Sequence, residues 1–185
     1  MPSQTSLLGA AGEHYVMSEL LRRGYIAPLA PQGVPNADII ACDVEGTRLC
    51  SIQVKTRRER GRDGGWHMKE KHEKLRSDTL FYCFVDFGTG VNAPVVYVVP
   101  SPHVAEALER SHRTWLSTPG KKGQEHKDSQ IRRLLPDYSR QLGATGHPYG
   151  KGWLNPYRDA WQLLKLEAAE PEATDAEQND DDAAA

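Results

Sequence analysis

The stretch PNADIIACDVEGTRLCSIQVK, residues 35–55, constrains the fold of this chain more than any other part of its sequence. It holds two apolar, strand-like runs, 37–44 and 47–55, which are joined at Glu45-Gly46. A two-residue connection with glycine in second place is typical of a β-hairpin. The spacing therefore predicts an antiparallel strand pair in which the numbers of two facing residues add up to 91.

That register brings polar side chains together at one end of the pair. Asp38 faces Gln53, with their Cβ atoms about 5 Å apart. Lys55 lies on the same face as Gln53, because side chains alternate along a strand, and a slip of one residue would dismantle the group. The pattern indicates either a site made of an acid, an amide and an ammonium group, or a capped turn at Asp38 and a solvated strand end at Lys55.

A helix is expected before this pair, over residues 4–23, with Gly24 as its C-terminal cap. The helical spacing of its apolar residues places Glu13 beside the buried face. A carboxylate there needs a cation, a hydrogen-bond donor or a metal ion. Gly9 and Gly12 would let another backbone segment approach near Glu13. The alternative is that Glu13 pairs with an arginine at the end of the same helix.

Both kinds of secondary structure are expected in the remainder. The expected segments are strands over 79–87 and 94–99, a helix capped by Ser101 that runs to about His112, a short helix over 129–135, and a last helix over 156–166. This order predicts an α/β fold of three-layer type, with a mixed β-sheet flanked by helices. A single domain is expected over 1–166, followed by an acidic, disordered tail over 167–185.

Charge is unevenly distributed along the chain, although the net charge is only −2. The tail holds eight acidic residues and no lysine or arginine, so residues 1–166 carry a net charge of +6. A basic folded part permits a polyanionic partner; a tail that serves only solubility is the alternative. Apolar runs fall short of the about 20 residues that a membrane helix needs, and no secretory signal is evident, so we expect a cytoplasmic protein without a membrane partner.

Glu13 on a helix, Asp38 at a strand start and Gln53-Val54-Lys55 at the end of its partner together resemble the motif of the PD-(D/E)xK nuclease superfamily, in a QxK variant. This is the fold of many restriction enzymes and Holliday junction resolvases, and the chain looks closest to resolvase-like and homing-type members. The resemblance covers roughly residues 9–58 and implies a restriction-endonuclease-like core. It also implies that Glu13, Asp38, Gln53 and Lys55 are catalytic.

Phosphodiester hydrolysis in this superfamily depends on a divalent cation, so the resemblance implies Mg²⁺ or Mn²⁺ as cofactor. The implied ligands are the carboxylates of Glu13 and Asp38, the amide oxygen of Gln53 and the backbone carbonyl of Val54, all of them oxygens that suit such an ion. Lys55 would position or deprotonate the attacking water, or stabilise the phosphate. Most members carry glutamate in place of Gln53, and the lost charge weakens metal affinity.

A basic segment begins at the proposed site. Residues 55–76 contain nine lysines and arginines against four acids. Such a density suits contacts with a phosphate backbone, which weaken steeply with salt. The residues expected to bind nucleic acid are Arg57, Arg58, Arg60, Arg62, Trp66 and Lys69. Trp66 would stack on a base or else pack in the core, and residues 69–74 are alternatively a plain exposed helix.

The sequence thus favours a metal-dependent endonuclease that acts on DNA and binds its backbone through the basic segment. An alternative is a non-catalytic nucleic-acid-binding module on the same fold, which the neutral side chain of Gln53 favours. A third hypothesis is a regulatory protein whose acidic tail occupies its own basic groove. Analogy with the resolvases suggests a homodimer.

Overall fold

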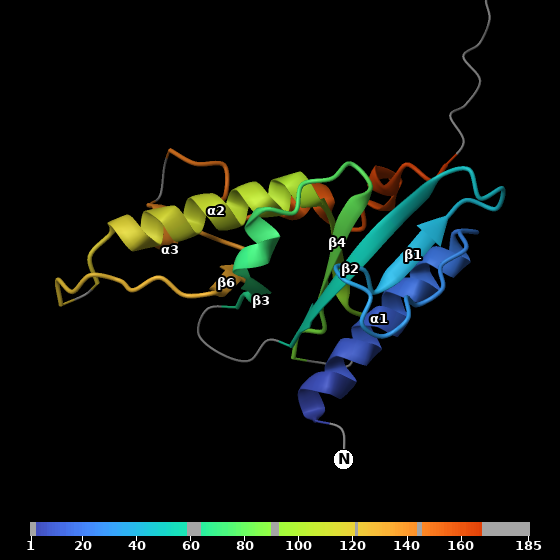
Figure 1. Cartoon of the computed structure of the whole chain (residues 1–185), viewed down its shortest axis with the longest axis horizontal. Helices are drawn as coiled ribbons and strands as arrows, with labels where there is room; N and C mark the ends of the chain where they lie inside the picture. Colours follow the sequence, from blue (N-terminus) through green and yellow to red (C-terminus); the bar gives the residue numbers. More distant parts are fainter. Residues whose placement is uncertain (1–2, 59–63, 90–92, 121, 144–145, 168–185) are drawn as a thin grey trace, which may run out of the picture.

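The computed structural model describes residues 3–58, 64–89, 93–120, 122–143 and 146–167 (Figure 1). Its helices are α1 (Gln4–Arg22), α2 (Ser101–Ser117) and α3 (Ser139–Leu142), with the 3₁₀ turns η1 (Glu70–Glu73), η2 (Asn155–Tyr157) and η3 (Trp161–Leu164). Its strands are β1 (Ile39–Cys42), β2 (Leu49–Arg57), β3 (Trp66–Lys69), β4 (Leu80–Asp86), β5 (Val95–Pro100) and β6 (Ile131–Leu134). No helix in the described part of the chain is both long and apolar enough to cross a membrane.

Four strands form a mixed sheet in the order β1-β2-β4-β5. β2 and β4 run parallel, whereas β1 with β2 and β4 with β5 run antiparallel. β3 and β6 form a separate antiparallel pair. Residues 80–85 of β4 are all buried, as expected for a strand that is covered on both faces.

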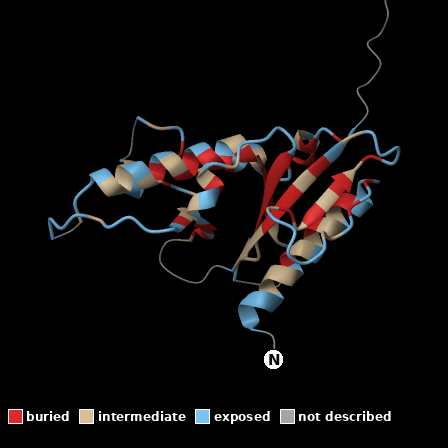
Figure 2. Ribbon diagram, viewed as in Figure 1, coloured by how far each residue is buried: buried red, intermediate tan, exposed pale blue. Residues whose placement is uncertain are grey.

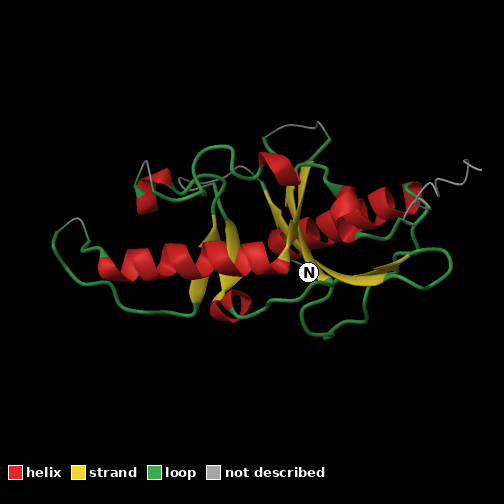
Figure 3. Ribbon diagram, turned by 90° about the horizontal axis from the view of Figure 1, so that it is seen from above, coloured by secondary structure: helices red, strands yellow, loops and turns green. Residues whose placement is uncertain are grey.

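Alternating side chains of β4 divide the core into two parts. Cys83 and Val85 pack with Val16 of α1 on one face of the sheet. Tyr82 and Phe84 pack on the other face, where α2 and the β3–β6 pair lie. Figure 2 shows this buried centre, and Figure 3 shows α2 running beside the smaller pair of strands. The fold is therefore α/β, a mixed sheet between helical layers, as the sequence predicts.

The predicted hairpin is present in its predicted register. Ile39 lies opposite Ile52, and Ala41 lies opposite Cys50, so the numbers of facing residues add up to 91. Two segments that are close in sequence thus set the position of every side chain at the start of β1 and along β2.

The connection between these strands differs from the prediction, because it spans residues 43–48 instead of two residues. The Asp43 carboxylate accepts hydrogen bonds from the backbone N–H groups of Thr47 (2.7 Å) and Arg48 (3.1 Å). Gly46 has a φ of 69° in the turn, a conformation that costs glycine little. The side chain of Asp43 therefore holds a wider loop without a change of register.

The helix predicted over 129–135 is wrong, because this segment contains β6. Arg132 and Leu134 are 5 % and 0 % exposed, whereas Ile131 is 65 % exposed. Burial of every second residue is the period of a strand. The partner of β6 is β3, a strand that the sequence analysis did not predict.

Two further helices differ from the prediction. In place of a helix over 156–166 the chain forms η2 and η3, separated at Asp159, whose φ of 49° is left-handed and interrupts a right-handed helix. α2 extends to Ser117, beyond the predicted end. Ser101 lies in the first turn of α2 and does not cap it, since its hydroxyl donates to the carbonyl of Ser77 (3.0 Å).

The end of the described chain is attached to the domain. Leu166 is 3 % exposed, and the hydroxyl of Tyr25 donates to Oε1 of Glu167 at 3.0 Å. The remainder of the predicted acidic tail, residues 168–185, lies outside the described residues.

α1 approaches β2 closely at one glycine. A Cβ atom on Gly12 would lie 1.9 Å from Oγ1 of Thr56, whereas a Cβ atom on Gly9 would have nothing within 4 Å. The helix ends at Arg22, one residue before the predicted end, with Arg23 as its C-cap, and Gly24 follows in the left-handed region at a φ of 83°. The close approach at Gly12 brings the next residue, Glu13, near the end of β2.

This contact predicts opposite effects for two glycine substitutions in one helix. Gly9→Ala should raise the free energy of unfolding by about 0.5–1 kcal/mol, because alanine favours the helix. Gly12→Ala should lower it by about 1–3 kcal/mol, because the added methyl group overlaps Thr56. Urea unfolding followed by circular dichroism measures both effects.

The added substitution Thr56→Ala removes the overlapping oxygen and should restore part of the stability of Gly12→Ala. Equal stabilisation by both alanine substitutions would contradict the close packing of α1 on β2.

Candidate active site

Asp38 is held by hydrogen bonds at the start of the hairpin. Its backbone N–H donates at 2.8 Å to the carbonyl of Ile52, which is also the strand partner of Ile39. Its Oδ2 accepts hydrogen bonds from the backbone N–H of Val54 at 2.7 Å and from the side-chain amide of Gln53. The side chains of Asp38 and Gln53 are therefore in direct contact, just beyond the last paired residues of β1 and β2.

The backbone of Val54 presents another oxygen at this place. The N–H and C=O groups of one strand residue point to the same side of the strand, so the carbonyl of Val54 points, like its N–H, toward the β1 side of β2. The paired residues of β1 and β2 end with Ile39 opposite Ile52. The carbonyl of Val54 thus lies past the last paired residues and points to the side of β2 on which Asp38 lies.

Lys55 and Glu13 are electrostatically coupled to Asp38. Burial lowers the pKa of Lys55, while Asp38 and, more weakly, Glu13 act to raise it. Burial also raises the pKa of Glu13, with Asp38 as the second cause; His14 and Lys55 act against this rise. The four predicted catalytic side chains are therefore gathered from α1, the residue before β1, and β2.

Glu13 does not pair with the arginines of its own helix. Arg22 and Arg23 both form ion pairs with Glu19, at 2.8 and 2.6 Å. The charges that act on the carboxylate of Glu13 include those of Asp38 and Lys55.

The residues gathered here fit a hard divalent cation through their oxygens. Within the described ranges there is no cluster of three His, Cys, Asp or Glu side chains that could hold a metal ion. An ion at this place would therefore need neutral oxygens beside the carboxylates of Glu13 and Asp38. The amide oxygen of Gln53 and the carbonyl of Val54 are of that kind, and Mg²⁺ and Mn²⁺ prefer oxygen ligands.

A cleft of about 400 Å³ opens next to these residues, between β2 and the segment of β3 and η1. Its lining residues are Gln53, Lys55, His67, Met68, Lys69, Lys71, His72 and Ile131. Gln53 and Lys55 of the candidate active site thus form one wall of the cleft. The opposite wall carries Lys69 and Lys71.

His72 is a buried, neutral part of this wall. It is 3 % exposed, and its Nδ1 lies 2.8 Å from the hydroxyl of Tyr82. Burial, and then the positive charges of Lys55, Lys71 and Lys69, lower its pKa to about 4. The imidazole therefore carries no charge at neutral pH.

Trp66 is buried, and Arg57 is largely covered, although both are predicted nucleic-acid contacts. Trp66 is 1 % exposed, and its Nε1 donates to the carbonyl of Val85 at 3.1 Å. The guanidinium carbon of Arg57 lies 4.0 Å from the centre of the Trp66 ring, and Arg57 Nε donates to Asp86 Oδ2 at 3.0 Å. Trp66 is therefore packed in the core, the alternative that the sequence left open, and has no ring face left for a base. Arg57 already has an anionic partner in Asp86, and its contact with nucleic acid stays a prediction.

The other predicted contacts have different positions. Arg58 and Lys69 are exposed, Lys69 on the wall of the cleft. Arg60 and Arg62 lie outside the described residues. The two exposed positions are compatible with phosphate contacts, which stay a prediction.

Two residues of the site were not identified from the sequence. Lys71 lines the cleft, and its Nζ donates to Oδ1 of Asn36 at 2.8 Å. Asn36 precedes Asp38 by two residues and has a φ of 62°, a left-handed conformation that asparagine tolerates better than most residues. Lys71 belongs to the basic run that the sequence shows. Its position at the cleft, however, depends on β3, a strand that no local pattern predicts.

The solved structures that are similar to this chain include a homing endonuclease and a Holliday junction resolvase. The bacterial homing endonuclease I-Ssp6803I is 18 % identical over 89 % of this chain and 94 % of its own, with a TM-score of 0.49. The Holliday junction resolvase Hjc of Archaeoglobus fulgidus is 13 % identical over 66 % of this chain and 86 % of its own, with a TM-score of 0.37. No protein-family model matches the chain, and no curated protein does.

The low pKa of His72 predicts how stability depends on pH. The folded protein has a pKa of about 4 at this residue, below the about 6.5 of an unfolded chain. The contribution of the neutral His72 to the free energy of unfolding is therefore complete above pH 6.5. It is lost as the pH falls toward 4, by up to about 3 kcal/mol. Urea unfolding of the wild type and His72→Gln across this range measures the difference.

Glutamine can still hydrogen-bond to Tyr82 but does not titrate, so the stability of His72→Gln relative to the wild type should improve as the pH falls. Unfolding free energies that fall in parallel for the two proteins would contradict a buried, neutral His72.

Proposed function

We propose that this protein is a divalent-metal-dependent endonuclease that hydrolyses phosphodiester bonds in DNA. One observation carries the proposal: Oδ2 of Asp38 is bound by the backbone of Val54 and the side chain of Gln53, with Lys55 next in the strand and Glu13 electrostatically coupled. Carboxylates beside an ammonium group at the edge of an open cleft suit a phosphate and a cation together.

In the proposed site Mg²⁺ or Mn²⁺ would be held by Asp38, Glu13, the Gln53 amide oxygen and the Val54 carbonyl. Such an ion, when bound, stabilises charge on the phosphate and lowers the pKa of a bound water. Lys55 would orient the attacking water and balance the growing negative charge. Its pKa is lowered, chiefly by burial, which brings the group closer to proton transfer at neutral pH.

A second candidate function is a nucleic-acid-binding module that does not cut. Its support is the amide of Gln53, which donates to Oδ2 of Asp38. That hydrogen bond satisfies part of the carboxylate without a cation, and Gln53 adds no negative charge to attract one. Binding of DNA without metal-dependent cleavage is the expected behaviour of such a module.

Cleavage assays separate these two candidates. Branched, single-stranded and duplex DNA should be cut in the presence of Mg²⁺ or Mn²⁺. Asp38→Asn and Lys55→Met should each reduce the rate by about 10²-fold or more, since each removes a group that acts on the reacting phosphate or water.

Lys74→Met is the matched control, because the Lys74 side chain is 76 % exposed and pairs with Glu70 away from the site. Cleavage that survives both site substitutions would come from a contaminant or another site and would reject the proposal.

Metal binding can be measured without catalysis, by the rise of the melting temperature with Mn²⁺. Gln53→Glu should melt lower than the wild type without metal, because a second carboxylate faces Asp38 and a donor is lost. Mn²⁺ should raise the melting temperature of Gln53→Glu more than that of the wild type. The corresponding gain in the free energy of unfolding is about 1.4 kcal/mol for each tenfold increase in metal affinity.

Asp38→Asn should abolish the Mn²⁺-dependent rise in both backgrounds. A rise that Asp38→Asn leaves intact, or that Gln53→Glu reduces, would place the metal elsewhere in the protein.

A further inference from the structure

Lysines gather along one cleft, while the two acids of residues 69–74, Glu70 and Glu73, are paired elsewhere. Lys69 and Lys71 line the cleft together with Lys55. Glu70, which lies between the first two, pairs with Lys74 at 3.4 Å. Positive charges at Lys69 and Lys71 are close enough to act on Lys55, and like charges held near one another repel unless an anion joins them.

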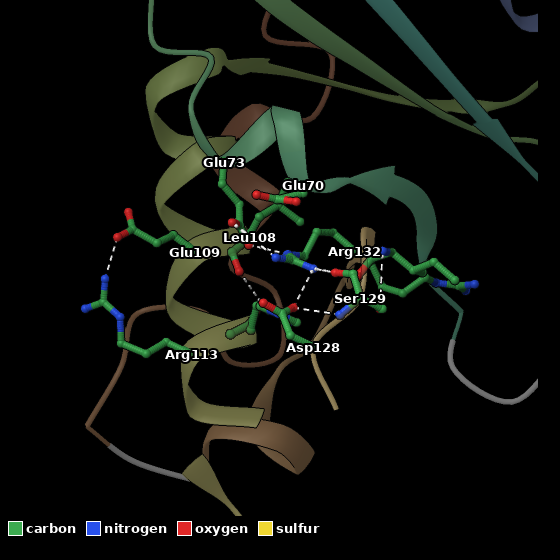
Figure 4. Close-up of polar contacts among 12 residues, drawn as sticks. Glu70, Glu73, Leu108, Glu109, Arg113, Asp128, Ser129 and Arg132 are labelled. Carbon is green, nitrogen blue, oxygen red and sulfur yellow. Dashed lines mark hydrogen bonds and ion pairs between the residues drawn. The ribbon is translucent and has the colours of Figure 1, made fainter. Parts of the chain in front are cut away.

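The wall that carries these lysines is fixed in place. Lys69 of β3 lies opposite Ile131 of β6 in the strand pair, and the backbone N–H of Glu70 donates to the carbonyl of Gln130 at 2.9 Å. Arg132, whose side chain is 4 % exposed, donates through Nε and Nη2 to the carboxylate of Glu73 (Figure 4). This buried ion pair joins β6 to η1, and it neutralises Glu73, the second acid of residues 69–74.

Arg132 is also bound to the backbone. Its Nη1 donates to the carbonyl of Ile131 at 3.0 Å and to the carbonyl of Ser129. A guanidinium held by a carboxylate and two carbonyls has little freedom to move. The lysines of the wall are therefore presented from a preorganised element, which is what a binding site requires.

One hydrogen bond joins this wall to the candidate active site. Lys71 Nζ donates to Oδ1 of Asn36 at 2.8 Å, and Asn36 precedes Asp38 by two residues. The amide holds the ammonium group without neutralising it. Asn36 is thus a positioning residue for Lys71 on the side of the cleft where Asp38 lies.

We propose that Lys69 and Lys71, with Asn36 positioning Lys71, form a second phosphate subsite, which binds the DNA phosphate adjacent to the one that is cleaved. The proposal rests on the proposed function for the identity of the strand, whereas the binding itself needs no metal. Lysine ammonium groups suit phosphate as point charges. The exposed side chain of Ile131 at the same cleft offers apolar surface to the sugar between two phosphates.

The test is DNA binding without metal, measured by fluorescence anisotropy in EDTA with labelled single-stranded and duplex oligonucleotides. Lys69→Gln and Lys71→Gln should each weaken binding about three- to tenfold at low salt. Each should also reduce the dependence of log K on log salt by about 0.7 on single strands and about 0.9 on duplex, between about 50 and 200 mM salt.

Lys74→Gln is the control, since it removes an equal charge from the same segment outside the cleft. It should bind within about twofold of the wild type with nearly the same salt dependence. Lys69→Arg/Lys71→Arg keeps both charges and should bind like the wild type. All the substituted side chains are exposed, and thermal melts confirm that the variants fold.

Asn36→Gly tests the positioning role, since glycine accepts the left-handed φ and removes only the side chain. It should weaken binding in the wild type and have no further effect in Lys71→Gln. Equal additional losses in both backgrounds would overturn the role of Asn36.

Wild-type affinity in Lys69→Gln/Lys71→Gln, or an equal loss in Lys74→Gln, would overturn the subsite. If the subsite holds while Asp38→Asn shows no effect on cleavage, only the proposed nuclease function fails. If cleavage depends on Asp38 while these lysines are irrelevant to binding, only the subsite fails.

Discussion

The hydrogen bond between the N–H of Val54 and Oδ2 of Asp38, 2.7 Å long, ties the chemistry of the site to the register of one strand pair. A half-buried carboxylate loses hydration and must find donors within the protein. Here one donor is a backbone group, which no substitution at position 54 except proline can remove, and the other is the amide of Gln53. Because Asp38 directly precedes β1, a slip by one residue would break both bonds and send the acid to the other face of the sheet. The register is thus a condition for the site and also for the core.

β2 serves both layers of the fold at once. On one face Thr56 lies so close to α1 that a Cβ atom at position 12 would overlap its hydroxyl, and the adjacent Glu13 comes near the end of the strand. On the other face Gln53 and Lys55 open to the cleft. Burial between the elements of the fold lowers the pKa of Lys55 and raises the pKa of Glu13. The same packing that stabilises the domain therefore brings two oppositely charged groups toward neutrality beside Asp38.

Basic residues that look alike in the sequence have different environments in the fold. Arg57 stacks on Trp66 and pairs with Asp86, so it joins β2 to β3 and β4. Arg132 is buried against Glu73 and joins β6 to η1. Such a buried pair adds little net stability over apolar packing, but it fixes where the β3–β6 wall stands. The exposed lysines Lys69 and Lys71 of that wall instead line the cleft, so among the described residues the basic segment is part scaffold and part surface.

The sequence by itself determined the hairpin register, the first helix and its glycine end, the mixed α/β class, and the encounter of Asp38 with Gln53 and Lys55. All of these depend on residues that are neighbours in the chain, where turn position and alternation leave few arrangements. Tertiary structure alone decided that residues 131–134 form a strand, that Trp66 is buried, and that Lys71 joins the site through Asn36. Those outcomes depend on partners distant in the sequence, and a side chain's local pattern does not record whether its partner will be water, a carboxylate or another strand.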